Sequence, residues 1–298
     1  MIDTVINTKN LKEADVVILS APYEKGVSFM GGTSKAPKKI LDCLNNNLEL
    51  FDINFLCEPA KKLKTYHKEI TNIKKLSPEK AIKKISEEYT KSFNDNKFII
   101  MLGGEHTVSI GAFDAISKKE NPKDITIVQI DAHQDLRDDN SDYSSHPTKY
   151  AHSCAMRRPH ELGFNLVQVG IRTFSKNEYE YWQANKKTIS VFEWTKKTKN
   201  PPEISEIISS IKTKKVYLTI DVDGFDPSCM PGTGTPVQGG LKWKYGLDLI
   251  EKIIEAKNVI GVDIVEVSPQ KDCVLTEFGA ASICYKIMAN KFKTKLLS

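Results

Sequence analysis

Carboxylate and imidazole side chains gather at four places in the sequence, each at the end of a run of apolar residues. The runs are FIIML, followed by GGEH; ITIVQI, followed by DAHQD; VYLTI, followed by DVD; and IGVDIV, followed by EVSP. An apolar run that gives way to polar residues is typical of a buried strand and the turn after it. The side chains with chemistry to offer at these strand ends are His106, Asp131, His133, Asp135, Asp221, Asp223 and Glu266.

All of these residues except Glu266 have the character of ligands for divalent metal ions. Carboxylates and imidazoles crowded into one cleft would repel each other or lose hydration unless a cation held them. Oxygen and imidazole donors without a thiolate suit manganese-like ions better than a cysteine-bound structural zinc. Six ligands exceed what one ion with an open position requires, whereas two ions that share carboxylates and a water would use them all. The residues therefore predict a site for two metal ions.

The spacing within two of the motifs predicts which side chains point the same way. In an extended segment, alternate residues lie on one side. The two aspartates and the histidine of DAHQD are therefore expected together, with the alanine and the glutamine turned away. The same reasoning places the two aspartates of DVD on one side.

Six apolar runs are candidate strands, and helical periodicity lies between them. The runs are DVVILS from Asp15, KFIIML from Lys97, DITIVQI from Asp124, NLVQVGI from Asn165, KVYLTI from Lys215 and VIGVDIVEV from Val259. Helices are predicted in SPEKAIKKISEEYTKSFND, with Ser77 as N-cap, and in GLDLIEKIIEA near residue 250. This alternation predicts an α/β fold, a three-layer α/β/α arrangement around a central, mostly parallel sheet, as one domain over residues 1–298. Ligands bind such sheets at the carboxyl edge, where the acids and histidines should converge.

Composition and charge disfavour several other classes of protein. No apolar stretch approaches the roughly 18 residues of a membrane span, and the N-terminus lacks a secretory pattern, so a cytoplasmic protein without membrane contact is expected. The six cysteines include no C-x-x-C pair, which predicts reduced thiols. The net charge of +5 comes from lysines, notably in runs from Lys61 and Thr195. These runs are predicted to be a solvated helix face and a surface loop, and nucleic acid is not expected as a partner.

Two other enzyme classes share single motifs with this sequence. DVDG alone is compatible with phosphotransferases of the haloacid-dehalogenase type, but their aspartate pair would follow the first strand and would not explain His106 and His133. The glycines of PGTGTPVQGG lack the G-K-[ST] ending of a phosphate loop, which disfavours nucleotide binding. NPPE at residues 200–203 is predicted to be a loop rather than a domain boundary.

Five motifs in order resemble those of the ureohydrolase family, which comprises arginases, agmatinases and their relatives. They are GGEHTVSIG, DAHQDLRD, YAHSCAMRR, DVDGFDPSCMPGTGTPVQGGL and DIVEVSPQKD. The similarity is greatest to the agmatinase branch and runs from about Pro22 to about Ala281. The resemblance implies an arginase-like α/β/α domain with two Mn²⁺ per subunit, in a homo-oligomer of three or six subunits.

The resemblance also implies a reaction and roles for individual residues. Agmatine would be hydrolysed to urea and putrescine, a step of polyamine biosynthesis, by a hydroxide that bridges the two ions. The six ligands named above match the family's ligands, with Asp135 and Asp221 as the bridging pair. Asp135 would also pass the hydroxide's proton to the leaving amine. Glu266 would accept hydrogen bonds from the guanidinium, and His152 would contact the substrate and carry protons to solvent.

The remaining histidines are given other assignments. His146 is a rival to His152 for the proton-carrying role, because both lie near the same motif. His160 and His67 are expected to be structural.

The sequence departs from the family pattern at a few positions. Ser34 and Ala36 stand where Arg and Gly are common, which leaves any substrate or subunit contact there open, and Glu105 stands where Asp is common. Arg137 replaces an Asn that helps arginases hold the amino-acid end of arginine, which disfavours arginine and favours agmatine. Aminopropylagmatine, guanidinobutyrate, whose anionic tail could use Arg137, and arginine remain alternative substrates. The substrate of a formiminoglutamase, which carries a formimino group, is a further alternative. A non-catalytic regulatory relative is disfavoured, because the six ligands and Glu266 are all present.

Overall fold

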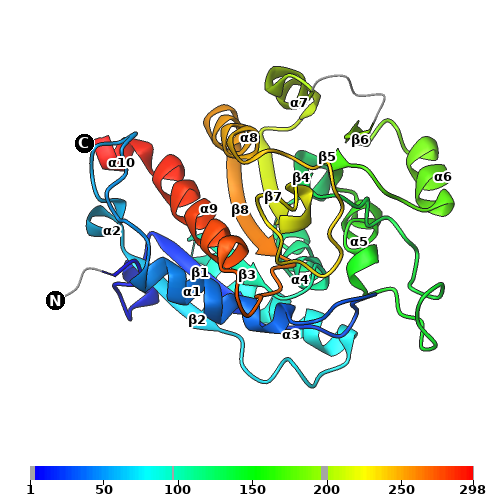
Figure 1. Ribbon diagram of the computed structural model, residues 1–298, viewed down its shortest axis with the longest axis horizontal. Helices are drawn as coiled ribbons and strands as arrows, with labels where there is room; N and C mark the ends of the chain where they lie inside the picture. Colours follow the sequence, from blue (N-terminus) through cyan, green and yellow to red (C-terminus); the bar gives the residue numbers. More distant parts are fainter. Residues whose placement is uncertain (1–3, 96, 196–200, 298) are drawn as a thin grey trace.

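A parallel sheet of eight strands forms the centre of the part of the chain that the computed structural model describes, residues 4–95, 97–195 and 201–297 (Figure 1). Its order is β2-β1-β3-β8-β7-β4-β5-β6. The strands are β1 (Val16–Ala21), β2 (Thr65–Glu69), β3 (Phe98–Gly103), β4 (Ile125–Ile130), β5 (Asn165–Ile171), β6 (Ile189–Glu193), β7 (Lys215–Asp221) and β8 (Asn258–Val265). The six predicted strands are confirmed, and β2 and β6 are additional.

The two additional strands form the two edges of the sheet. Among the described strands, β2 has β1 as its one neighbour, with a single further bridge to Thr8, and β6 has β5. β2 reads TYHKE and is exposed toward its end, so it lacks the continuous apolar run of the inner strands. The prediction of a solvated helix face for the run from Lys61 was therefore wrong, because helix α2 (Pro59–Lys62) ends as the run begins and β2 follows. The run from Thr195 lies almost entirely outside the described residues.

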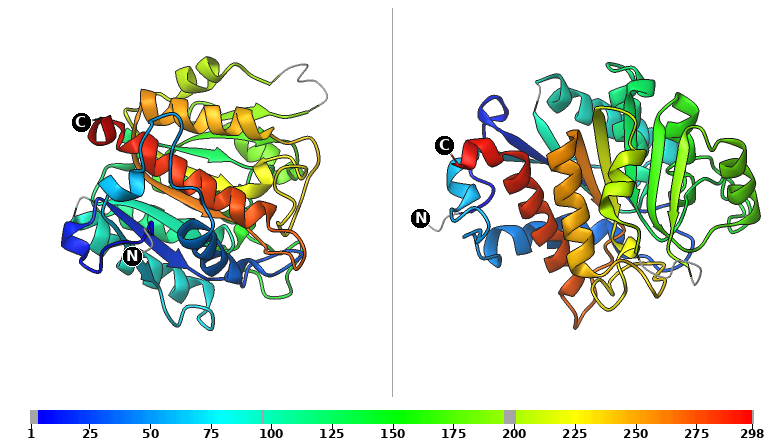
Figure 2. Two further views of the ribbon diagram at one scale, coloured as in Figure 1. Left: turned by 60° about the vertical axis from the view of Figure 1, so that its left-hand side comes forward. Right: turned by 90° about the horizontal axis from the view of Figure 1, so that it is seen from above.

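Helices cover both faces of the sheet, which confirms the three-layer α/β/α prediction (Figure 2). One face is covered mainly by α1 (Ala36–Asn46), α8 (Trp243–Ala256) and α9 (Leu275–Lys291), with the short α2, α7 (Ile204–Ser210) and α10 (Lys293–Leu297) at its margin. The other face is covered by α3 (Pro78–Asn94), α4 (Thr107–Ser117) and α5 (Arg157–Leu162), and α6 (Lys176–Ala184) packs its aromatic residues against this layer. Ser77 precedes α3 as predicted, but its side chain makes no capping hydrogen bond.

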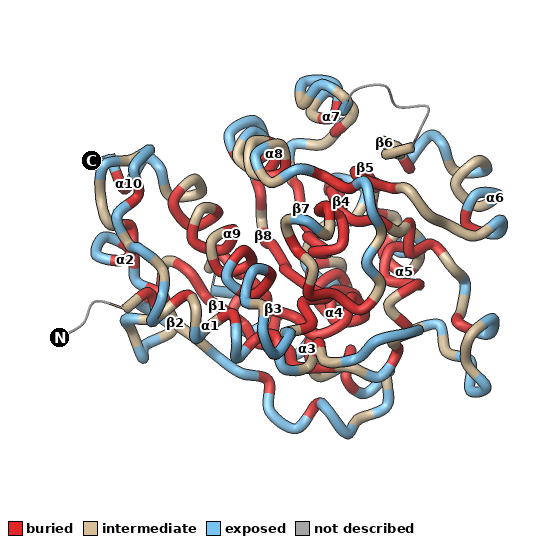
Figure 3. Tube along the Cα trace, in the orientation of Figure 1, coloured by how far each residue is buried: buried red, intermediate tan, exposed pale blue. Residues whose placement is uncertain are grey.

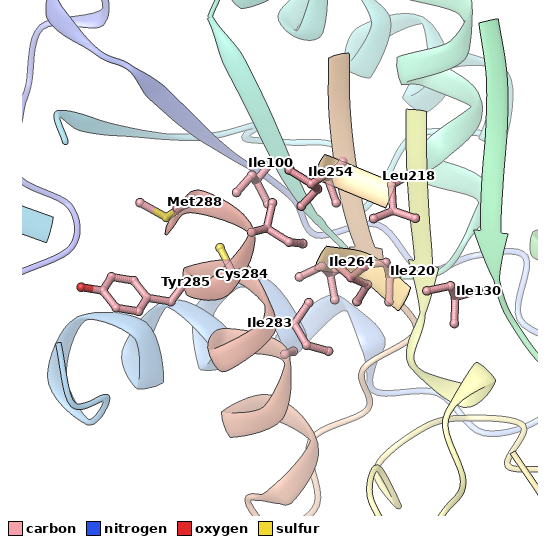
Figure 4. Close-up of a cluster of buried hydrophobic side chains, with 14 of the residues drawn as sticks. Ile100, Ile130, Leu218, Ile220, Ile254, Ile264, Ile283, Cys284, Tyr285 and Met288 are labelled. Carbon is pink, nitrogen blue, oxygen red and sulfur yellow. The ribbon is translucent and has the colours of Figure 1, made fainter. Parts of the chain in front are cut away.

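Apolar side chains hold these layers together. Figure 4 shows Ile283 of α9 facing Ile264 of β8, with Ile220 of β7 and Ile130 of β4 beside them. Burial is continuous along the inner strands and the inward sides of the helices, whereas the outer loops are exposed (Figure 3). Burying each such side chain contributes roughly 1.5–3 kcal/mol, so the sheet is a rigid support for whatever its ends carry. None of the described helices has the length and apolar character needed to cross a membrane.

The four strands that end in acids and histidines are neighbours in the sheet. Their order is β3-β8-β7-β4, although they are far apart in sequence. β3 and β4 are consecutive strands in the sequence, but two places lie between them in the sheet. β8 and β7, which come later in the chain, fill these places, so the switch point of the sheet lies between β3 and β4. Ligands of open parallel sheets bind at the carboxyl ends of the strands at such a point.

Candidate active site

Six acidic and imidazole side chains converge at the carboxyl ends of β3, β4 and β7. His106 Nδ1 lies 3.0 Å from Asp135 Oδ2, 3.2 Å from Asp131 Oδ2 and 3.5 Å from Asp221 Oδ2. His133 Nδ1 lies 3.1 Å from Asp223 Oδ2 and 3.5 Å from Asp131 Oδ1. These side chains form two overlapping groups that could each hold a metal ion, His106 with Asp131 and Asp135, and Asp131 with His133 and Asp223.

Asp131 is the residue that joins the two groups. Its Oδ2 faces His106 and its Oδ1 faces His133, so one oxygen is directed to each half of the cluster. Asp135 belongs only to the half that contains His106. The family resemblance predicted Asp135 and Asp221 as the shared pair, whereas among the described residues it is Asp131 that belongs to both groups.

The motif DAHQD is a loop and not the extended strand end that its alternation predicted. β4 ends at Ile130, and Asp135 has a φ of 53° in the left-handed region. The alanine and glutamine of the motif are nonetheless fully buried, and neither is among the residues that line the cavity over the cluster. In DVD, Asp221 ends β7 while Asp223 lies in a 3₁₀ turn over Val222–Gly224.

Of the four described non-glycine residues with a positive φ, two are functional residues, and the others, Leu56 and Asn72, lie in loops away from the cluster. Besides Asp135, Glu266 has a φ of 62°, directly after β8. A bulky L-residue in this region is uncommon and persists where the surroundings impose it. For Glu266, its backbone N–H donates to Gly104 O at 2.9 Å and its Oε1 accepts from His106 N–H at 2.8 Å. The strained conformation thus directs the carboxylate back toward the cluster.

Buried polar residues within the strands orient the ligands. Gln129 Nε2 donates to Asp131 Oδ2 at 2.6 Å. Thr219 Oγ1 donates to Asp263 Oδ1 at 2.5 Å and lies 2.8 Å from His106 Nε2. Because the hydroxyl proton of Thr219 is directed to Asp263, the threonine oxygen accepts from Nε2–H of His106, which leaves Nδ1 as the ligand atom in the neutral ring.

These orienting residues were not predicted from the sequence. The available signal was a polar residue inside an otherwise apolar, buried strand, since such a group requires a hydrogen-bond partner. Gln129, Thr219 and Asp263 all fit that description within ITIVQI, VYLTI and IGVDIV. The backbone N–H of Ser28, which donates to His152 Nε2, could not be predicted in the same way, because the contact does not depend on the type of side chain.

The ionisation of the cluster shows its need for positive charge. Burial, reinforced by Asp131, raises the pKa of Asp135 to about 6. Burial and the carboxylates of Asp223 and Asp131 raise the pKa of Asp221 well above its usual range. Burial alone would lower the pKa of His106, but Asp131 and Asp135 outweigh it and raise this pKa well above its usual range. Without cations the cluster retains protons instead.

The residues present fit a pair of divalent cations. His106 Nδ1 is completely buried and makes no hydrogen bond in the described structure, although carboxylate oxygens surround it. A buried imidazole nitrogen amid carboxylates is what a metal ion of the manganese type would satisfy. The chemistry of the donors, oxygen and nitrogen without sulfur, points the same way.

Glu266 and His152 lie beside the cluster, as expected for residues that contact a substrate. His152 Nδ1 lies 3.3 Å from Glu266 Oε1, and the backbone N–H of Ser28 donates to His152 Nε2 at 3.1 Å. In the described part of the chain, both hydrogen-bond contacts of the Glu266 carboxylate use Oε1, so Oε2 can take another donor. Burial would lower the pKa of His152, but Glu266, Asp135 and Glu105 raise it to about 9.

A cavity of about 300 Å³ opens over the cluster. This volume is within the range of small-molecule sites, roughly 300–1,000 Å³. Arg137 lines it, but its guanidinium is ion-paired with Asp142 and its Nε lies 3.7 Å from Glu178 Oε2. Arg137 therefore offers little net positive charge to a ligand. The other lining residues are Ser28, His133, Asp135, Tyr143, His152, Ser153, Thr173, Phe174, Ser175, Glu178, Asp221, Asp223 and Thr235.

The other histidines lie outside this cavity. His146 is exposed and contacts Ser145, so the structure places His152, and not its rival, beside the cluster. His160 contacts Tyr181 and Thr188, and His67 contacts Ser20. All six cysteines are free thiols, in agreement with the prediction.

Comparison with known proteins gives one consistent result. The sequence matches the model described as the arginase family over residues 14–289. It is 35% identical over 280 residues to the N(1)-aminopropylagmatine ureohydrolase of Synechocystis sp., covering 93% of this chain and 89% of that protein. It is 32% identical over 264 residues to the agmatinase of Bacillus subtilis, covering 88% and 86%. The solved agmatine ureohydrolase of Thermoplasma volcanium superposes with a TM-score of 0.82 at 28% identity, covering 98% of this chain and 95% of that one. These similarities confirm the resemblance predicted from the five motifs.

Proposed function

The chain belongs to the arginase family of hydrolases, and on this premise we propose that it cleaves the guanidinium group of agmatine to urea and putrescine. The observation that carries the proposal is the convergence of six ligand-type side chains, the five of the two groups that share Asp131 and Asp221 beside His106, with the second oxygen of Glu266 next to them. A cluster of this kind suits hydrolysis of a poor electrophile, because the carbon of a guanidinium shares its charge with three nitrogens.

We propose that the six residues hold two divalent cations, with Mn²⁺ as the ion that best matches the donors. The ligands are His106, Asp131, His133, Asp135, Asp221 and Asp223. When bound, such ions supply Lewis acidity, which lowers the pKa of water and stabilises developing negative charge. Asp131 and Asp221 would lie at the centre of such a site, since Asp131 faces both histidines and Asp221 lies 3.5 Å from His106 Nδ1 and accepts from the backbone N–H of Asp223.

The chain's own residues orient the substrate and move protons. Glu266 Oε2 accepts hydrogen bonds from the planar guanidinium, a charge-assisted contact that fixes its orientation. Asp135, whose carboxyl is buried, takes a proton from the attacking water and delivers it to the leaving amine. His152 lines the cavity next to Glu266 and exchanges protons with solvent. The two products are urea and a primary amine.

The pairing of Arg137 bears on the tail of the substrate. Arg137 is neutralised by Asp142 and Glu178, so it gives a carboxylate tail little attraction. The four aspartates of the cluster would be balanced by two divalent cations, so they give no preference for a cationic tail. The neutralised Arg137 supports agmatine over guanidinobutyrate and arginine, which carry a carboxylate.

A longer cationic tail is the second candidate. The 35% identity to the aminopropylagmatine ureohydrolase of Synechocystis sp. supports N(1)-aminopropylagmatine as the substrate. A second hollow of about 330 Å³ adjoins the cavity and shares Arg137 and Ser175 with it, which gives a longer tail room.

One experiment distinguishes these substrates. Urea release by the manganese-loaded protein is measured with agmatine, aminopropylagmatine, arginine and guanidinobutyrate, with metal-stripped protein as the control. Metal-dependent turnover with agmatine preferred supports the proposal, and preference for aminopropylagmatine supports the second candidate. If no guanidino compound gives urea although cations bind, the proposed reaction is wrong, and formamide release from a formimino substrate becomes the next assay.

We also propose that the protein is a single-domain, cytoplasmic homo-oligomer. Several large apolar side chains are exposed, including Phe29 at 75%, Ile53 at 75% and Val274 at 61%, and a second copy of the chain could cover them. Size-exclusion chromatography with light scattering separates a monomer from the expected trimer or hexamer.

A further inference from the structure

A segment near the N-terminus covers one side of the cavity. This roof segment, residues 24–32, contributes Ser28 to the cavity lining and exposes Phe29 at its tip. Its far end is tied down by Glu24, whose carboxylate accepts from the backbone N–H groups of Gly32 and Ser34, each at 2.7 Å. Ser268 Oγ donates to Gly31 O at 2.9 Å. The segment is thus held at its far end by bonds that do not involve the metal ligands.

The near end of the roof segment is held by Glu105. Its Oε1 accepts from the backbone N–H groups of Lys25 at 2.8 Å and Gly26 at 2.7 Å. Glu105 is fully buried, and its own N–H donates to Tyr23 O at 3.0 Å. A Cβ at Gly26 would lie 2.9 Å from Ala151 Cα and 3.0 Å from Glu105 Oε2, so the segment packs closely against the carboxylate. The glutamate at this position therefore has a specific partner, which an aspartate, shorter by one methylene, would reach less well.

The roof segment also fixes the ring of His152. The N–H of Ser28 donates to His152 Nε2, and a backbone N–H can only donate. In the neutral ring Nε2 is therefore the unprotonated nitrogen, and the ring proton sits on Nδ1, which faces Glu266 Oε1 at 3.3 Å. The raised pKa of His152 belongs to the cluster without cations, and positive charge bound beside the ring would lower it. The position of Ser28 selects one of the two neutral tautomers and directs its proton to the residue that is proposed to hold the guanidinium.

We propose that Glu105 is a positioning residue for catalysis, which anchors the roof segment so that the Ser28 N–H holds His152 with Nδ1–H directed at Glu266. This inference rests on the proposed function, because the roles of His152 and Glu266 are assigned there. Loss of the anchor leaves the buried N–H of Gly26 and the partly buried N–H of Lys25 without their acceptor and releases Ser28 from the ring. Without the Glu105 carboxylate, we expect His152 to be misoriented while the metal ligands keep their positions.

The anchoring is tested first without any activity measurement. Lys25 lies in the roof segment and is exposed, so trypsin cleavage after Lys25 reports how often the segment opens. In Glu105→Ala, loss of two hydrogen bonds should raise this cleavage by about tenfold or more, measured by mass spectrometry as a ratio to cleavage after the exposed Lys187. Glu105→Gln, which keeps an acceptor oxygen, should stay within about threefold of wild type.

A matched control separates anchoring from general destabilisation. Glu178 is also buried and its carboxylate also accepts from two backbone N–H groups, those of Leu136 and Ser175. Glu178→Ala should leave the cleavage ratio at Lys25 unchanged, whatever it does to activity. An equal rise in this control would overturn the anchoring role of Glu105.

Kinetics then test the link to His152. In manganese-loaded Glu105→Ala, kcat for agmatine should fall by about tenfold or more while KM stays within about threefold, because Glu266 is still in place; Glu105→Gln should recover most of kcat. Metal content per chain should be unchanged. Wild-type cleavage in Glu105→Ala, or faster cleavage with an unchanged kcat, overturns the proposal. If the wild-type protein itself releases no urea, the proposed function fails, while the cleavage ratio still decides the anchoring.

Discussion

Replacement of Thr219 by valine tests how the buried strand residues prepare His106 to bind a metal ion. Valine has nearly the shape of threonine but lacks the hydroxyl, which accepts from His106 Nε2–H and donates to Asp263 Oδ1. Tyr217 OH still donates to Asp263 Oδ2 at 2.9 Å, so Asp263 keeps one partner. The perturbation is therefore confined to one oxygen atom.

The expected magnitude follows from the two buried groups that lose a partner. His106 and Asp263 are both fully buried, so water cannot replace the hydroxyl. An unsatisfied buried group costs about 1–3 kcal/mol, so the two groups together predict a loss of roughly 2–6 kcal/mol in the free energy of unfolding. The imidazole also loses the bond that fixes its tautomer, and loss of such outer contacts typically weakens metal affinity by about 10–100-fold.

Two measurements on matched variants check this prediction. Guanidinium chloride unfolding of the metal-free protein gives the stability change, and competition with a chelator gives the Mn²⁺ affinity. Thr219→Ser keeps the hydroxyl and should remain close to wild type in both. If Thr219→Val binds Mn²⁺ as tightly as Thr219→Ser and is equally stable, the Thr219 bond does not prepare the ligand, and the reasoning is refuted.

Four further predictions follow from the same geometry. Asp135→Asn should lower kcat for agmatine by about 100-fold or more; a kcat near wild type in a steady-state urea assay would exclude Asp135 as the proton carrier. Glu266→Gln should lower kcat/KM by about tenfold or more, because a charge-assisted contact to the guanidinium is lost; an unchanged kcat/KM would contradict that contact. Arg172→Lys should lower the Tm by roughly 4–10 °C in calorimetry. Arg172 donates to the carbonyl oxygens of Asp223 and Val237 at 2.6 and 2.7 Å, and a lysine cannot reach both. An unchanged Tm would show that these two hydrogen bonds do not stabilise the protein. In the metal-free protein, the pKa of Glu105 is raised from 4.5 to about 7 and that of Asp135 from 3.8 to about 6. Their contribution to stability is therefore complete below pH 3.8 and is lost as the pH rises through about 7, by roughly 3 kcal/mol for each group. Chemical denaturation of the metal-free protein should show lower stability at pH 7.5 than at pH 5, and Mn²⁺ should reverse this loss. A metal-free protein that is more stable at pH 7.5 would contradict the assignment.

Much of the fold could be predicted because the inner strands are buried on both faces. β4 and β7 are mostly apolar along their whole length, which is typical of a parallel sheet with helices packed on both faces. β2 and β6 could not be predicted in this way, because an edge strand has one neighbour and tolerates exposed polar residues. Their positions follow from pairing with β1 and β5, which is a tertiary property.

The ligand residues could be located because they follow directly on recognisable strands. The sharing of ligands could not, since it depends on the direction of single oxygen atoms. Asp131 faces both histidines only because the chain leaves the extended conformation after Ile130 and turns at Asp135. Alternation in the sequence predicted a straight segment there. Backbone donors such as the N–H of Ser28 are invisible in the sequence, because every residue except proline carries one.

Titration of the metal-stripped protein with Mn²⁺ while urea release from agmatine is followed is the most direct test of the central claim. The six side chains around Asp131 predict that activity is absent without metal and reaches its plateau at two ions per chain. Activity without metal, or a plateau at one ion per chain, would contradict a two-ion centre at the ends of β3, β4 and β7.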